Sequence, residues 1–158
     1  MSSDTQPGKG TTTETRPVEL VQNAGYSFDI AFGPGLPSVK SDEGPPLGRG
    51  QGPSPAQLLV AAVCNCLSAS LFFALSKFKD SPEPVSASGV ATVGRNAENH
   101  LRVLAIRVNL KLGVPAAALP HLEKALARFE SFCTVTQSVR AAIPVEVQVY
   151  DGDGNRVY

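Results

Sequence analysis

The sequence predicts an α+β domain in which helices lie against one face of an antiparallel sheet. Three observations lead to this prediction. Stretches that alternate apolar and polar residues occur in pairs, a long apolar helix separates the two pairs, and further helical segments precede a last strand. Strand pairs separated by long helices are typical of α+β proteins. The expected order is therefore two strands, a helix, two strands, two helices and a strand.

Length and composition are those of a globular protein. The chain has 158 residues, of which 42% are hydrophobic and 18% charged, so it can bury a core of its own. Residues 1–16 contain almost nothing apolar. We therefore expect a disordered tail over 1–16 and a single domain over 17–158.

The charges of the chain are balanced. Lys and Arg together number 14, as do Asp and Glu, and this balance does not favour binding to nucleic acid or to an anionic membrane. The N-terminus lacks the basic start and apolar stretch of a secretory signal. The apolar run around Leu58 is interrupted by polar residues and is shorter than the roughly 20 residues that span a bilayer. We expect a cytoplasmic protein with no membrane or nucleic-acid partner.

The first part of the domain is expected to form an antiparallel hairpin. Residues 18–21 can form one strand, and residues 26–32 alternate apolar and polar side chains as a half-buried strand does. Residues 23–25 would make the turn between them. The Gly- and Pro-rich residues 33–53 predict an ordered loop with a candidate short strand at 36–39, and Arg49 is the one arginine in this loop.

A long helix over residues 54–77 is the expected central element. Ser54 is a suitable N-cap, and Pro55 suits the first helical position, where a backbone donor is not needed. The helix is apolar on nearly every side, so we expect it to be buried in the middle of the protein. Spacings of three and four residues place five side chains on one stripe: Leu58, Ala62, Cys66, Ala69 and Phe73.

The second half of the domain predicts another hairpin, two helices and a strand. Residues 85–93 and 101–112 read as antiparallel strands, the second with clear alternation. A helix is expected over 117–132, with Cys133 continuing its apolar stripe. Thr134 and Gln137 match a capping box before a third helix over 135–142, and a last strand is expected over 145–150.

The three cysteines are the candidate functional residues. An odd number of cysteines in a reducing compartment favours free, reactive or catalytic thiols over a disulfide framework. Cys64 and Cys66 project about 200° apart on a helix and cannot serve one site, and spacing alone does not choose between them. A metal site is not expected, because these two thiols diverge and neither His100 nor His121 has ligand spacing.

Two segments of the sequence resemble the OsmC/Ohr family of thiol-dependent hydroperoxide reductases and their relatives. GPSPAQLLVAAVCNCLSAS, residues 52–70, is similar to the family's Gly-x-x-Pro-x-x-Leu-Leu-x-Ala-Ala run, which ends in a cysteine on the central helix. The number of residues between the proline of this run and the family's cysteine matches that cysteine to Cys66. FCTVTQSVRAAIPVEVQV, residues 132–149, resembles the family's Cys-Pro-Val-Ser run and matches its cysteine to Cys133. The resemblance covers residues 18–150.

The resemblance implies both a fold and an activity. The fold would be OsmC-like, with antiparallel sheets wrapped around a central buried helix in an intertwined homodimer. Cys66 would be the peroxidatic thiol and Cys133 the resolving thiol of an antioxidant enzyme of the stress response. Its substrates would be organic hydroperoxides, and a dithiol reductant such as a lipoyl protein would recycle it. This chemistry requires no metal or other cofactor.

Two positions differ from the family's pattern. Ala56 stands where active members have a glutamate, and Gln57 points about 100° away on the helix. The family's arginine falls at residues 25–26, which are not basic, and this leaves Arg49 or Arg16 as candidate replacements. The alternative function is therefore that of a weak or inactive relative that binds a small apolar ligand at the dimer interface.

Overall fold

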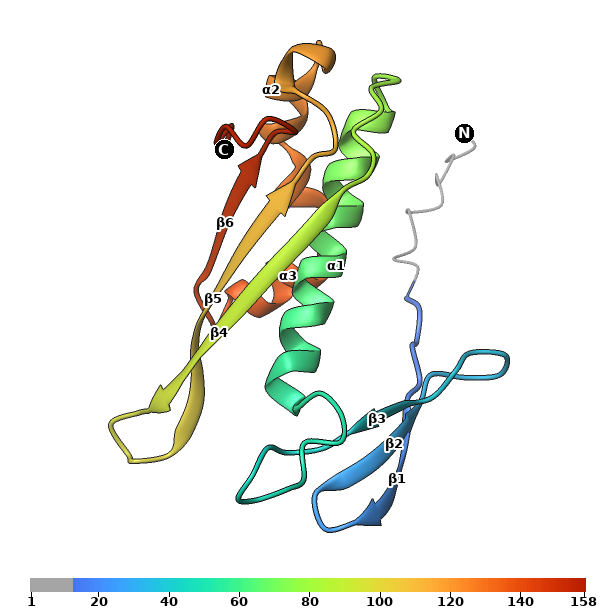
Figure 1. The fold of residues 1–158 in the computed structure, drawn as a ribbon, viewed down its shortest axis with the longest axis vertical. Helices are drawn as coiled ribbons and strands as arrows, with labels where there is room; N and C mark the ends of the chain where they lie inside the picture. The colour runs from blue at the N-terminus through green and yellow to red at the C-terminus, as the bar shows by residue number, and fades with distance from the viewer. Residues whose placement is uncertain (1–12) are drawn as a thin grey trace, which may run out of the picture. The chain divides into compact units, whose positions relative to one another are not determined.

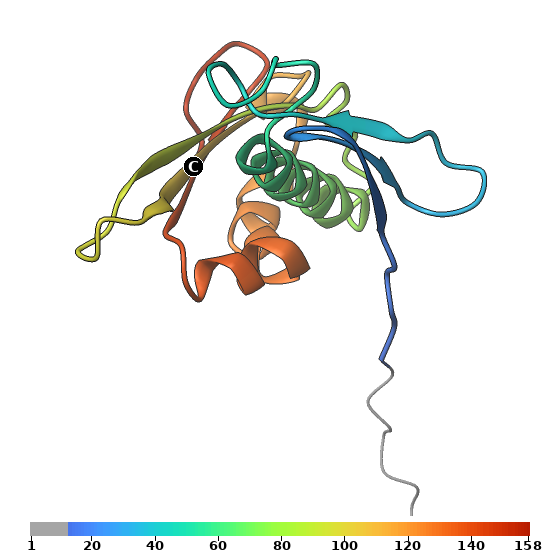
Figure 2. The same ribbon diagram turned by 90° about the horizontal axis from the view of Figure 1, so that it is seen from below.

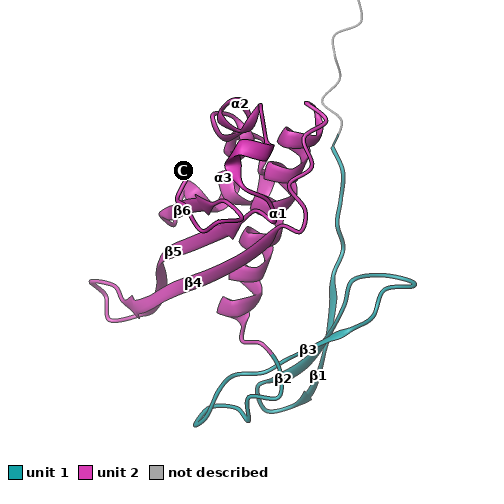
Figure 3. Ribbon diagram, turned by 45° about the horizontal axis from the view of Figure 1, so that its top comes forward, with its two compact units in different colours: residues 1–52 teal, residues 53–158 magenta. Residues whose placement is uncertain are grey.

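The structure is a computed structural model that describes residues 13–158 (Figure 1). The first twelve residues of the predicted tail lie outside the described part. The chain divides into two compact units, an N-terminal unit up to Gly52 and a C-terminal unit over Pro53–Tyr158 (Figure 3). The assignment of residues 17–158 to a single domain stays a prediction.

The N-terminal unit contains a three-stranded antiparallel sheet. Its strands are β1 (Glu19–Ala24), β2 (Ser27–Ala31) and β3 (Val39–Ser41), in the order β1-β2-β3. The predicted hairpin is confirmed, and Gly25 takes a positive φ of 56° in its turn. The third strand begins later than predicted, because the Leu36 N–H bonds to the Gly33 carbonyl in a turn and residues 36–38 remain outside the sheet.

Helix α1 (Pro55–Ser76) is the longest element of the C-terminal unit. It begins as predicted: Ser54 Oγ accepts a hydrogen bond from the Gln57 N–H at 3.3 Å, and Gln57 Oε1 accepts one from the Ser54 N–H at 2.9 Å. This reciprocal pair is a capping box, which satisfies two backbone donors that the helix leaves free.

Within this chain α1 is buried on one face only, although the sequence predicts burial on nearly every side. The buried residues are Val60, Val63, Leu67, Ser70, Leu71, Ala74 and Leu75. On the stripe of Leu58, Cys66 and Phe73, Phe73 is 49% exposed, Ala62 and Ala69 are exposed, and Cys66 is half-buried. The helix is apolar all round, so its pattern did not distinguish the face that packs within this chain from the face that does not.

The second sheet has the order β4-β5-β6, from β4 (Ser86–Arg95), β5 (Leu101–Lys111) and β6 (Val145–Tyr150). Strands β4 and β5 pair in antiparallel fashion, as predicted, whereas β6 runs parallel to β5. The expectation of a wholly antiparallel sheet is therefore wrong at β6. The helical segment between β5 and β6 is long enough to return the chain to the end of the sheet where β5 begins, which is what a parallel connection requires.

The helix predicted over 117–132 is broken into short pieces. These are a 3-10 turn (Ala116–Ala118), helix α2 (Leu122–Leu126) and a second 3-10 turn (Phe129–Phe132). Pro120 has no N–H to donate, so α2 starts only after it. The buried Asp80 carboxylate accepts the free His121 N–H at 2.9 Å at this new start.

Helix α3 (Thr134–Arg140) begins one residue earlier than predicted, and its N-cap is Cys133 rather than Thr134. The Gln137 N–H bonds to the Cys133 carbonyl, and the Gln137 side chain donates to the Glu130 carbonyl. The predicted capping box with Thr134 is therefore wrong. Its consequence is that the cysteine itself occupies the turn at which α3 starts.

Helix α1 lies along one face of the β4-β5-β6 sheet, and α2 and α3 pack beside it on the same side (Figure 2). Alternate β5 residues face this core: Ile106, Val108 and Leu110 are buried. The α+β fold class, with two sheets and a central helix, is confirmed. By length and composition alone α1 could cross a membrane, but the core helix of a soluble protein meets the same criteria, and its Val60 to Leu75 face packs on this sheet.

Candidate functional site

The structure places Cys66 and Cys133 on two packed elements. Cys66 lies in the middle of α1 and is half-buried, whereas Cys133 is fully buried at the start of α3, an element that packs on α1. Both thiols are free. The fold thereby brings together two cysteines that lie 67 positions apart in the sequence.

The environment of Cys133 shifts its acidity. Burial raises the pKa of the Cys133 thiol, and interaction with the neighbouring Cys66 thiol raises this pKa further. The Thr136 hydroxyl and backbone N–H act in the opposite direction and lower it. The Cys133 thiol donates a hydrogen bond to Thr136 Oγ1 at 2.9 Å. Cys66 and Thr136 thus both act on the buried sulfur.

An ion pair between Glu130, which precedes Cys133, and Arg140, which follows it, stabilises the turn that carries Cys133. The Cys133 N–H bonds to the Glu130 carbonyl at 3.1 Å, and the Glu130 carboxylate pairs with the Arg140 guanidinium at the far end of α3. Arg140 also donates to the Val145 carbonyl, and the Tyr158 hydroxyl donates to Glu130 Oε1 at 2.6 Å. The turn that carries the thiol is therefore tied through Glu130 and Arg140 to the start of β6 and to the C-terminal Tyr158.

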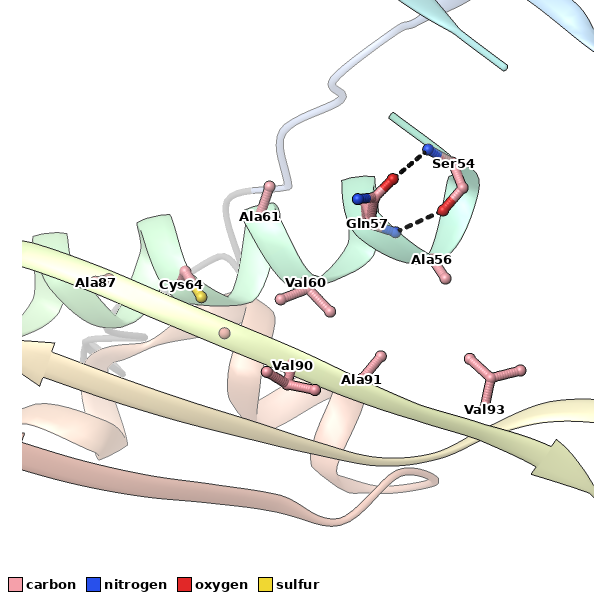
Figure 4. A pocket seen from close by; sticks show the side chains of 11 residues that line it. Ser54, Ala56, Gln57, Val60, Ala61, Cys64, Ala87, Val90, Ala91 and Val93 are labelled. Atoms are coloured by element: carbon pink, nitrogen blue, oxygen red, sulfur yellow. Dashed lines mark hydrogen bonds between the residues drawn. The ribbon is translucent and has the colours of Figure 1, made fainter. Parts of the chain in front are cut away.

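Cys64 faces a different space from Cys66. It lines a cavity of about 700 Å³ between α1 and β4, together with Ala56, Val60 and Gly89 (Figure 4). Ala56, Val60 and Cys64 are four residues apart and share this face of the helix. Burial raises the pKa of the Cys64 thiol. The expectation that the two helical cysteines serve separate places agrees with this arrangement.

Arg49, the predicted candidate for an activating arginine, belongs to the N-terminal unit. Its side chain is exposed, and it lines a cavity of about 330 Å³ in that unit together with Tyr26 and Lys40. The loop around it is fixed by the buried Asp42, whose Oδ2 accepts the Arg49 N–H at 3.0 Å and the Gln51 N–H at 3.1 Å. Arg16, the other candidate, forms an ion pair with Glu14.

Thr136 is the residue that the sequence analysis missed. It is fully buried against the Cys133 sulfur, yet in the sequence it is one of several hydroxyl residues of a short helix. Its spacing of three from Cys133 was the available signal, because residues three apart near a helix start lie on the same side. Over residues 13–158 no group of three His, Cys, Asp or Glu side chains could hold a metal ion.

Fold and site together define an α+β protein with two neighbouring free thiols, one half-buried on its central helix and one buried at the start of a short C-terminal helix. Residues 48–148 match the model of the OsmC-like protein family, and the chain belongs to that family. Among curated proteins, none matches this sequence.

Several solved structures share the fold at low sequence identity. An OsmC-like protein of unknown function from Vibrio cholerae is 16% identical with a TM-score of 0.73, over 87% of this chain and 99% of its own. The organic hydroperoxide resistance protein OsmC of Legionella pneumophila is 18% identical with a TM-score of 0.67, over 88% and 98%. The organic hydroperoxide resistance protein OhrB of Bacillus subtilis is 14% identical with a TM-score of 0.65, over 86% and 98%.

Proposed function

We propose that this protein reduces organic hydroperoxides through a dithiol and disulfide cycle of Cys66 and Cys133. The observation that carries the proposal is the interaction of the two thiols across α1 and α3. The family, and the hydroperoxide resistance named for two of the similar structures, support the same chemistry. Because the cycle needs a supply of reductant, the proposed location is the cytoplasm.

The first half of the cycle oxidises Cys66. Its thiolate attacks the terminal oxygen of the hydroperoxide, the O–O bond breaks, and the alkoxide leaves and takes up a proton to give the alcohol. Sulfur loses two electrons and becomes a sulfenic acid. Cys66 suits this role because it is only half-buried, so a substrate can approach its sulfur, whereas Cys133 is fully buried.

The second half forms and then reduces a disulfide. The Cys133 thiolate attacks the Cys66 sulfur, a sulfur–sulfur bond forms, and the hydroxide that leaves Cys66 is protonated to water. A dithiol reductant such as a lipoyl protein then restores both thiols by exchange and is itself oxidised to a disulfide. Arg49 is proposed as the arginine that assists the Cys66 thiolate.

The test is to treat the reduced protein with cumene hydroperoxide and to map its thiols by mass spectrometry. We expect a disulfide between Cys66 and Cys133 and a free Cys64. The Cys66→Ser variant should consume no peroxide, and the Cys64→Ser variant, the matched control two residues away, should consume it at the wild-type rate. Thiols that remain unchanged after treatment would end the proposal.

We also propose that the protein is a homodimer. The face of α1 that carries Ala62, Ala69 and Phe73 is apolar and not buried, and Phe72 beside it is 40% exposed. An exposed apolar face of this kind is typical of an interaction surface. Sedimentation should show a dimer for the wild type and a monomer for Phe73→Glu, with Leu101→Glu, at the exposed end of β5, as the control.

The alternative function is binding of a small apolar ligand at the dimer interface, without catalysis. One observation favours ligand binding itself: the 700 Å³ cavity beside Cys64 is walled by Ala and Val side chains of α1 and β4, and its size suits a small ligand. This cavity lies on the Cys64 face of α1 and not on the Phe73 face proposed for the dimer. Ala56, which lies in this wall, has no charge to offer to a thiol. The cumene hydroperoxide experiment separates the two functions, since a ligand-binding protein would keep all three thiols.

A further inference from the structure

We propose that Thr136 is a catalytic residue of the second half-reaction, because its hydroxyl is placed to hold the Cys133 proton at rest and to stabilise the Cys133 thiolate during attack. The inference rests on the proposed function. It concerns a residue that carries no charge and stands three positions after the cysteine in a seven-residue helix. The evidence is the geometry of the contact and the nature of the groups around it.

The contact is closed to solvent on both sides. Cys133 and Thr136 are each 0% exposed, and the thiol donates to Thr136 Oγ1 at 2.9 Å. A threonine hydroxyl is both a donor and an acceptor, so it can rotate when the sulfur loses its proton and donate to the thiolate instead. The same atom therefore serves the resting state and the attacking state without movement of the backbone.

The Cys133 thiolate requires a hydrogen-bond donor to stabilise its charge. Burial and the neighbouring Cys66 thiol both disfavour its charged form, and the Thr136 hydroxyl and N–H are the groups that favour it. Two charged residues beside this turn, Glu130 and Arg140, form an ion pair with each other. No charged side chain among residues 13–158 is a cause of the shift in the Cys133 pKa.

Thr136 is neither consumed nor altered when the disulfide forms. Cys133 loses its proton before the attack, and the Thr136 O–H turns to the sulfur as the negative charge develops there. The thiolate then attacks the Cys66 sulfenic acid, the sulfur–sulfur bond forms as the bond to the hydroxide breaks, and the hydroxide takes up a proton and leaves as water. Loss of this donor should slow disulfide formation and leave sulfenic acid formation at Cys66 unaffected.

The test compares Thr136→Val, which keeps the shape, with Thr136→Ser, which keeps the hydroxyl. The exposed Thr134→Val of the same helix is the matched control. After a pulse of cumene hydroperoxide, dimedone trapping should show that Thr136→Val accumulates Cys66 sulfenic acid and forms the disulfide about tenfold or more slowly, the effect expected for loss of a hydrogen bond to a charged group. Thr136→Ser and Thr134→Val should form it at close to the wild-type rate.

A second measurement is independent of peroxidase activity. In the Cys64→Ser, Cys66→Ser background, the thiolate absorbance at 240 nm against pH reports the pKa of Cys133 alone. Thr136→Val should raise this pKa, and Thr136→Ser should leave it nearly unchanged. An equal pKa in all three proteins, or disulfide formation by Thr136→Val at the wild-type rate, would overturn the role of Thr136. If peroxide oxidises Cys66 in no variant, the proposed function fails, and the pKa measurement still tests the Thr136 contact.

Discussion

Gly89 of β4 lies against Cys64 of α1 so closely that a Cβ atom at position 89 would stand 2.5 Å from the Cys64 sulfur and 2.6 Å from Val60 Cγ1. Both neighbours have short side chains on a helix, so relief of the contact requires a different side-chain rotamer or a shift of α1. Gly89→Ala should therefore lower the free energy of unfolding by about 1–3 kcal/mol, as overpacking of a core does. Urea denaturation of the reduced protein measures this loss.

The double variant Gly89→Ala, Cys64→Ala gives the control. Removal of the sulfur relieves the closer of the two contacts, so the double variant should recover part of the stability that Gly89→Ala loses. The Val60 contact remains and prevents full recovery. If the stability loss of the double variant equals the sum of the losses of Gly89→Ala and Cys64→Ala, the two residues are not in steric contact.

The capping box predicts the effect of Ser54→Ala. The Ser54 hydroxyl satisfies the Gln57 N–H at the start of α1, and alanine cannot replace it. We expect a loss of about 1 kcal/mol in the free energy of unfolding, the usual cost of an N-cap serine. Ser81→Ala, in the exposed loop after α1, is the control and should change stability little. A Ser54→Ala variant as stable as the wild type would mean that the cap contributes nothing.

Sequence patterns predicted the parts of this fold that depend on local chemistry. Ser54 and Pro55 located the start of α1, and the alternation of residues 101–112 located β5, because caps and strand periodicity act over a few residues. Which face of α1 packs within the chain and the direction of β6 were not predicted, since both depend on contacts with distant segments. For the site, the resemblance selected Cys66 and Cys133, but only the packed structure puts the Thr136 hydroxyl at the Cys133 sulfur.

The Glu130 and Arg140 pair predicts a stability loss that a surface ion pair would not produce. The Glu130 side chain is 16% exposed and the Arg140 side chain 35%, and Arg140 also binds the Val145 carbonyl. Arg140→Ala should cost about 1.5–3 kcal/mol, because it leaves a largely buried carboxylate without its charged partner. Arg128→Ala, at an exposed position of the preceding turn, should cost little. Equal losses in the two variants, measured in urea, would contradict this role for the pair.

The buried thiol of Cys133 predicts how stability depends on alkaline pH. Its pKa is raised in the folded protein, mainly by burial, whereas an unfolded cysteine has a pKa of about 8.5. Between these two pKa values the unfolded state binds fewer protons than the folded state. The free energy of unfolding should therefore fall as the pH rises above about 8.5, by up to roughly 1.4 kcal/mol per pH unit for this thiol.

Cys133→Ala tests the source of this slope. Urea titrations of the reduced proteins at several pH values between about 8 and 10 give the slope for each. The variant should show a shallower fall than the wild type, with a remainder from Cys64, whose pKa burial also raises. The double variant Cys64→Ala, Cys133→Ala should be shallower still. Parallel curves for wild type and Cys133→Ala would mean that the Cys133 thiol ionises in the folded protein as easily as in the unfolded chain.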